Sequence, residues 1–194
     1  MTFGIALSCK ADLGTTPISS VPYVMSMFTG YTIGELTVIL NMLFIIAQPV
    51  MLRYIPWQQV LGQTATLLVF GPEIDFCMYL LRWFKPASLG EMWGACVLSA
   101  VILALGIFLC VKAKIFTAAG EGVVMVMDQV TGYGFAFLKN CFDISLVLIS
   151  LAISFTVFGE MRGVGLGTIA AAVLVGRMVR LYEKKLQFVN KWSV

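Results

Sequence analysis

Histidine is absent from this 194-residue chain, and charged residues make up only 12% of it. Without histidine the chain lacks the commonest metal ligand and the usual general base, and no Ser-His or Cys-His catalytic pair can form. The phosphate-binding pattern G-x-x-x-x-G-K-[ST] is missing as well, which excludes nucleotide hydrolysis by that route. The thirteen basic residues are spread along the chain and predict no nucleic-acid interface. We therefore expect neither an enzyme nor a nucleic-acid-binding protein.

Cysteine is also used sparingly. The five cysteines are scattered and form no C-x-x-C pair, so their spacing predicts neither a disulfide framework nor a metal site. They are better explained as small apolar residues of a membrane protein. We expect no cofactor and no metal.

Apolar residues dominate what is present. Hydrophobic residues make up 60% of the chain and the mean hydropathy is +0.95. Soluble domains carry roughly 25% charged residues, about twice the share found here. The composition predicts an all-α, polytopic transmembrane helical bundle whose main partner is the lipid bilayer.

One stretch occurs twice. Residues 4–31 and 106–133 align without a gap at an offset of 102 positions, with 12 identities in 28, including Lys-Ala and Thr-Gly-Tyr in register. Such self-similarity indicates a duplicated unit. We place the first membrane repeat at residues 1–86 and the second, with its basic tail, at residues 87–194. An apolar segment of about 16 residues precedes the second copy, whereas three residues precede the first. This difference predicts a truncated first helix, the alternative being a diverged copy that starts with a half-helix.

Each unit contains a short segment that cannot cross a bilayer. Residues 15–28 and 117–130 number about 14 each, whereas a spanning helix needs roughly 20. Pro17 suits the first turn of a helix, and irregular backbone at membrane depth survives only within protein or beside water. We expect two short, non-spanning helices. The expected spanning helices are residues 33–52, 58–81, 91–110, 135–158 and 165–181.

Counting helices sets the orientation of the two units. If the short segments do not cross, each unit has three spanning helices, and an odd number inverts the second unit relative to the first. Inversion places eight basic residues on the side of the C-terminal tail and four on the other, whereas parallel units give seven and five. The positive-inside rule therefore favours inversion with a cytoplasmic C-terminus.

Three motifs resemble one family. KADLGTTPISSVPY at residues 10–23, GEG at residues 120–122 and FGEMRGVGLGT at residues 158–168 are similar to the YczE/YyaS/YitT-type small bacterial membrane proteins. The resemblance covers almost the whole chain. It implies a polytopic protein of the bacterial inner membrane, of a kind described as permeases without an agreed substrate. Members normally begin with a full apolar helix before GIAL, which this chain lacks.

Burying a polar residue within an apolar segment costs free energy, so each such residue needs a hydrogen-bonding or charged partner or a water-filled cavity. Asp143 aligns with Asn41 at the repeat offset, and Lys139 lies four residues before Asp143 on the same helical face. An internal Lys139–Asp143 bridge, or Asn41 as an interhelical hydrogen-bonding residue, remains an alternative to ligand contact. Glu121 lies between two glycines and either complements its own helix or faces a ligand. The candidate substrate-binding residues are Ser19, Ser20, Asn41, Glu121, Lys139 and Asp143.

Two functions follow from this pattern. The first is a permease that carries an unidentified small solute through a site between the two repeats, because interrupted segments in both halves are the best sequence indicator of such a site. The second is a non-transporting scaffold or regulatory partner of another membrane protein. The sequence leaves open whether the chain forms a homo-oligomer.

Overall fold

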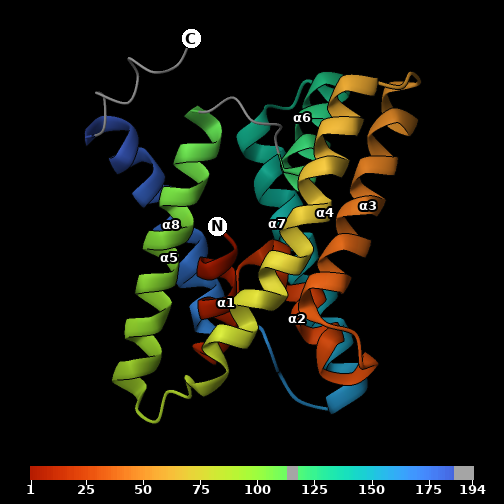
Figure 1. Cartoon of the computed structure of the whole chain (residues 1–194). Coiled ribbons are helices and arrows are strands. Elements are labelled where there is room, and N and C mark those ends of the chain that lie inside the picture. The colour runs from red at the N-terminus through yellow and green to blue at the C-terminus, as the bar shows by residue number, and fades with distance from the viewer. Residues whose placement is uncertain (113–117, 186–194) are drawn as a thin grey trace.

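The computed structural model describes residues 1–112 and 118–185, and within them every regular element is helical. Figure 1 shows the bundle. The helices in chain order are α1 (Thr2–Lys10), α2 (Pro17–Thr29), α3 (Ile33–Leu52), α4 (Trp57–Leu80) with a 3₁₀ turn (Leu81–Trp83), α5 (Leu89–Lys112), α6 (Ala119–Thr131), α7 (Phe135–Phe158) and α8 (Leu166–Lys185). The expected all-α bundle is confirmed at this level.

Four of the described helices are long and apolar enough to cross a membrane. They contain the segments Ile33–Leu52, Trp57–Trp83, Leu89–Leu109 and Phe137–Phe158, with mean hydropathies between 1.3 and 2.4. The last expected span differs, because the apolar part of α8 is the shorter segment Leu166–Val179.

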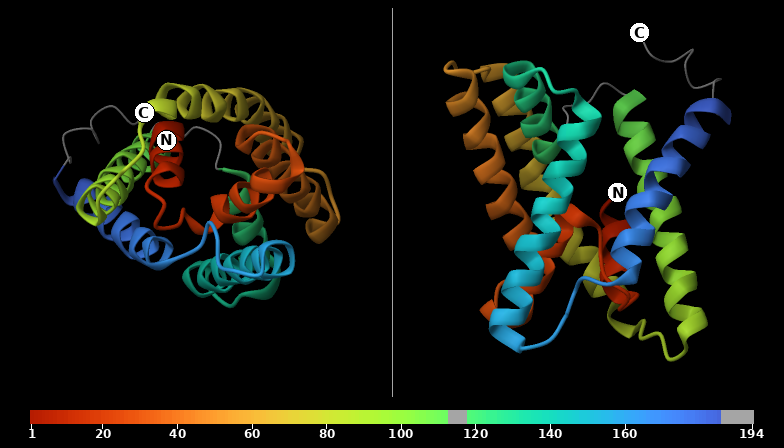
Figure 2. Two further views of the ribbon diagram at one scale, coloured as in Figure 1. Left: turned by 90° about the horizontal axis from the view of Figure 1, so that it is seen from below. Right: turned by 180° about the vertical axis from the view of Figure 1, so that it is seen from behind.

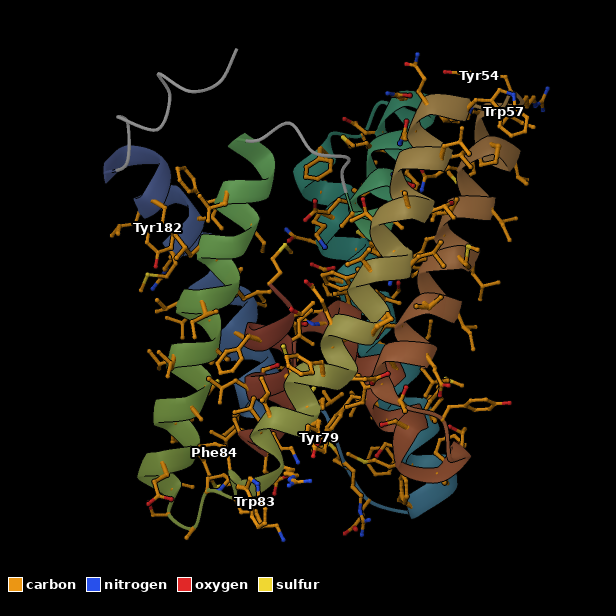
Figure 3. The ribbon with its side chains drawn as sticks, viewed as in Figure 1. Tyr54, Trp57, Tyr79, Trp83, Phe84 and Tyr182 are labelled. Atoms are coloured by element: carbon orange, nitrogen blue, oxygen red, sulfur yellow. The ribbon has the colours of Figure 1, made fainter. Side chains whose placement is uncertain are left out.

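Aromatic side chains mark both ends of α4. Tyr54 and Trp57 lie at its first end, and Tyr79 and Trp83 lie at the other (Figure 3). All four are more than half exposed. A helix of 24 residues is about 36 Å long, enough for a bilayer core of about 30 Å with headgroup contact at both ends. Exposed aromatic rings at these levels are typical of membrane interfaces.

The two short helices are where the sequence predicts them, and each begins within the bundle. Helices α2 and α6 have 13 residues each, or about 20 Å, which is too short to span. Pro17 occupies the first helical position of α2 after Thr16 in an extended conformation. Gly30 and Gly132 end the two helices with positive φ. Figures 1 and 2 show α2 in the lower half of the bundle and α6 in the upper half.

Helices α2, α3 and α4 run opposite to α6, α7 and α8, respectively. In Figure 1, α3 rises and α4 descends, whereas α7 descends and α8 rises. Helix α2 runs downward from the middle of the bundle, and α6 runs upward. Helix α2 packs on α7, and α6 packs on α3.

Glycine brings α3 and α4 into backbone contact. A Cβ on Gly34 would lie 2.3 Å from the carbonyl oxygen of Gly71. This closeness lets Asp75 of α4 reach the first turn of α3, where its carboxylate accepts from the Gly34 N–H at 2.9 Å and from the Thr32 hydroxyl at 2.7 Å. Thr32 and Glu35 also form a capping box. The carboxylate thus joins two helices at a helix N-terminus, where negative charge is favourable.

Replacing Asp75 by Ala should therefore lower the free energy of unfolding by about 2 kcal/mol, because two hydrogen bonds to a charged acceptor are lost. Glu73→Ala is the matched control. Glu73 is an exposed carboxylate two residues earlier, and its one side-chain contact is a 3.5 Å approach to Thr2. Thermal melting of both variants in detergent checks the difference. Equal melting temperatures would show that the Asp75 contacts contribute nothing.

Two of the family-like motifs meet at one end of the bundle. Leu13 accepts from the Gly167 N–H at 2.8 Å, and the Thr15 N–H donates to the Gly163 carbonyl at 3.3 Å. Gly14 has φ +102°, and a Cβ there would lie 2.4 Å from the Thr168 hydroxyl. These backbone contacts fix the start of α2 against the start of α8.

Candidate functional site

The first turn of α2 satisfies its own hydroxyl groups. Ser19 Oγ accepts from the Thr16 hydroxyl at 3.1 Å, and Ser20 Oγ donates to the Pro17 carbonyl at 2.7 Å. Ser19 and Ser20 are buried. Their hydroxyl groups are engaged in these local hydrogen bonds, so the remaining polar groups of this turn are those of the backbone.

The first turn of α6 is packed tightly through its glycines. A Cβ on Gly120 would lie 2.3 Å from Cδ1 of Ile18 in α2, and one on Gly122 would lie 2.5 Å from Nε2 of Gln63 in α4. The short helices therefore touch each other, and α4 reaches the start of α6. Small residues are needed here because other side chains fill the space where a Cβ would be.

Three glutamines from α3 and α4 form a chain of amide hydrogen bonds beside this turn. Gln59 Nε2 donates to Gln48 Oε1 at 2.9 Å, and Gln48 Nε2 donates to Gln63 Oε1 at 2.9 Å. Gln48 is fully buried and also approaches the Ala119 carbonyl at 3.4 Å. Gln63 is 3% exposed, and its Nε2 has no hydrogen-bond partner among the residues that the structure describes. Sequence reasoning missed this cluster as a site.

A matching contact exists at the other short helix. Ser150 of α7 donates to the Ser20 carbonyl of α2 at 3.1 Å and is fully buried. Gln48 and Ser150 are 102 positions apart, which is the offset of the sequence repeat. In both places a polar side chain of a long helix contacts a carbonyl in the first turn of the other half's short helix.

Lys139 and Asp143 are joined by an ion pair at 2.6 Å, with side chains 27% and 26% exposed. The charges of Lys139 and Asp143 both act on the carboxyl group of Glu121 in α6. Burial raises the pKa of the Glu121 carboxyl, while Lys139 lowers it and Asp143 raises it further. These three candidates are brought together as one charged group between α6 and α7.

Asn41 is not part of that group. Its Nδ2 donates to the Thr37 carbonyl of its own helix at 2.8 Å, and no hydrogen bond among the described residues joins it to Asp143. Asn41 is buried. The bond lies within α3, whereas the alternative considered from the sequence was an interhelical bond.

A cavity of about 720 Å³ lies elsewhere, where the family-like motifs meet. It is lined by Asp12, Leu13, Gly14, Met27 and residues 160–166. Arg162 and Glu160 form an ion pair there. None of the candidate site residues lines this cavity. Its position at the loops places it outside the contact between the two short helices.

Comparison with known proteins identifies a family whose function is unknown. The chain is 23% identical over 195 residues to the uncharacterized membrane protein YczE of Bacillus subtilis, which covers 98% of this chain and 84% of that protein. No solved structure matches. A model of a family of unknown function, DUF6198, matches residues 1–184. The chain is therefore a multi-pass membrane protein that belongs to the DUF6198 family.

Proposed function

We propose that this protein is a permease of the bacterial inner membrane, with no enzymatic activity, and that a small solute passes between its two halves. The observation that carries the proposal is the pair of short helices whose first turns meet inside the bundle. Ser150 contacts the first turn of α2, and Gln48 contacts that of α6. Helices that begin at mid-depth leave backbone groups available to a solute.

The proposed halves are residues 1–86 and 87–194, in opposite orientations. Contacts exchanged at the offset of 102 support this arrangement. A Cβ on Gly4 would lie 2.9 Å from the Leu103 backbone, and one on Gly106 would lie 3.0 Å from the Met1 backbone. The two contacts are the same pair with the halves exchanged. The opposite directions of α3 and α7 agree with inversion.

The last helices of the two proposed halves, α4 and α8, do not pack in the same way. Helix α4 packs along α3, but among the described residues α8 has no comparably extensive packing on α7. Gly71 of α4 is in contact with Val38, while Gly176 of α8 has open space around its Cβ position. A permease whose halves rearrange during transport requires such unequal packing in any single state.

Charge placement supports one orientation in the membrane. Helices α3 and α8 end at the top of Figure 1, and α4 ends at the bottom. Arg53 follows α3, and Arg177, Lys184 and Lys185 lie in the last part of α8, whereas Arg82 follows α4. Among the described residues the end at which α3 and α8 finish therefore carries more basic residues than the end at which α4 finishes, and we propose that it faces the cytoplasm.

A scaffold or regulatory partner is the second candidate. It is favoured by the internal hydrogen bonds of Ser19, Ser20 and Asn41, which occupy side chains expected to face a solute. The unpartnered amide of Gln63 and the charged group at Glu121 favour the permease, because a purely structural bundle gains nothing from them.

Osmotic swelling of proteoliposomes tests the proposed function. Vesicles containing the purified protein are placed in iso-osmotic solutions of carboxylic acids, amino acids, sugars, polyols and ammonium salts. The permease should accelerate swelling in at least one solute class by tenfold or more over protein-free vesicles. Swelling equal to that of protein-free vesicles in every class would overturn the proposal and favour the scaffold.

A further inference from the structure

The orientation of the three amides leaves one donor unused. Gln48 Nε2 approaches the carbonyl oxygens of Phe44 at 3.3 Å and Ala119 at 3.4 Å, so its nitrogen must point toward them. Gln63 must then present its oxygen to Gln48, because two amide nitrogens cannot hydrogen-bond each other. The Nε2 of Gln63 is thereby fixed as a buried donor beside Gly122, in the first turn of α6.

The same turn offers further donors. The first N–H groups of a helix have no acceptor within the helix, and Ala118 provides no side-chain cap for α6. The helix dipole adds a partial positive charge at this end. The buried Gln63 amide and the N–H groups that open the helix are all donors, so their common complement is a group with acceptor oxygens only. A carboxylate has that character, whereas a hydroxyl or an ammonium does not.

We propose that Gln63 and the first turn of α6 form a binding site for the carboxylate group of a small solute. This inference rests on the proposed permease function and names its substrate class. The carboxylate accepts from Gln63 Nε2 and from backbone N–H groups at the start of α6. Gln48 and Gln59 hold the Gln63 amide in the orientation that presents its nitrogen.

The surrounding charges add a requirement. The charged groups near this turn are Glu121 on α6 itself and the Lys139–Asp143 pair on α7. The described parts of α3 and α4 place no ionisable side chain at this level, since Glu35, Glu73 and Asp75 belong to the opposite end of those helices. A bound carboxylate adds negative charge beside Glu121, so binding should be tightest when Glu121 carries a proton.

Acetate is the probe for this site, because it consists of a carboxylate and a single methyl group. We expect acetate to raise the melting temperature of the purified full chain by about 5 °C at roughly a hundredfold excess over its dissociation constant. Chloride at equal ionic strength should give no such rise. Gln63→Met should melt no lower than the unchanged protein and should lose the acetate response. Gln58→Met, at an exposed position of the same helix, should keep it.

The outcomes separate the alternatives. An acetate response that is absent, equal to that of chloride, or unchanged in Gln63→Met overturns the site. Loss of the response in Gln63→Met alone supports it. A response in Glu121→Gln that no longer weakens as pH rises supports the proton requirement. Swelling in neutral solutes without an acetate response would leave the permease and remove this site. An acetate response without swelling in any solute would support the carboxylate site and overturn the permease.

Discussion

Replacing Gly34 by Ala is expected to lower the free energy of unfolding by about 3 kcal/mol, from overpacking and from loss of charged hydrogen bonds. The new Cβ would lie 2.3 Å from the Gly71 carbonyl oxygen and 2.5 Å from Oδ2 of Asp75. A backbone oxygen cannot move away without displacing its helix. Helices α3 and α4 would separate, and the Asp75 contact with the Gly34 N–H would be lost as well.

Gly176→Ala is the matched control for this change. Gly176 lies within α8 and has no atom within 4 Å of its Cβ position. Alanine is favoured over glycine inside a helix by up to about 1 kcal/mol, so this variant should melt at the same temperature or higher. Thermal melting in one detergent compares the two. A Gly34→Ala protein as stable as the Gly176→Ala protein would mean that α3 and α4 are not held at this contact.

Replacing Asp143 by Asn is expected to reduce solute flux at least tenfold while costing only about 1 kcal/mol of stability. The stability cost is small because the Lys139–Asp143 pair is a quarter exposed and spans one helical turn. Glu121 lies near enough to balance Lys139 when Asp143 is neutralised. The flux depends on the Lys139–Asp143 pair for a different reason, because this pair sets the charge beside the proposed carboxylate site.

The measurement compares swelling rate and melting temperature for Asp143→Asn in the solute that the unchanged protein conducts. The double variant Lys139→Met with Asp143→Leu is the control, because it removes both charges and leaves no unpaired ammonium. It should be stable and inactive. Severe destabilisation of Asp143→Asn with full flux in the surviving protein would assign the pair a structural role only.

The sequence predicted the short helices well. Proline at the start of α2 and the Thr-Gly-Tyr turns after both short segments give local signals that do not depend on packing, and the observed bounds agree within about two residues. The length of the apolar segments predicted five spans, and four of the described helices are long and apolar enough to be spans. The apolar part of α8 was overestimated because its C-terminal residues alternate between apolar and basic.

The polar contacts were predicted less completely. A Lys139–Asp143 bridge was one of the alternatives considered from the sequence, because a spacing of four residues places both on one helical face. The glutamine cluster depends on which faces of α3 and α4 meet, which periodicity does not determine. A signal was nevertheless present, because Gln59 and Gln63 are four residues apart and lie level with Gln48 across a short hairpin. Asp75 caps α3 from about forty residues away in sequence, a contact that no local pattern predicts.

A single cysteine at position 63 tests most directly whether a site between the halves is reached by water. The five native cysteines are replaced by serine or alanine, and Gln63→Cys is introduced alone. Right-side-out and inverted membrane vesicles are then treated with a charged, membrane-impermeant methanethiosulfonate reagent. Leu43→Cys, at an exposed apolar position of the spanning helix α3, serves as the lipid-facing control.

The permease account predicts that the cysteine at position 63 is modified from both faces of the membrane, because a site between two rearranging halves opens to each side in turn. The lipid-facing control at position 43 should remain unmodified from either face. If position 63 is also unmodified from both faces while the protein is folded, the bundle is closed and dry, and the account of a solute path between its halves is contradicted.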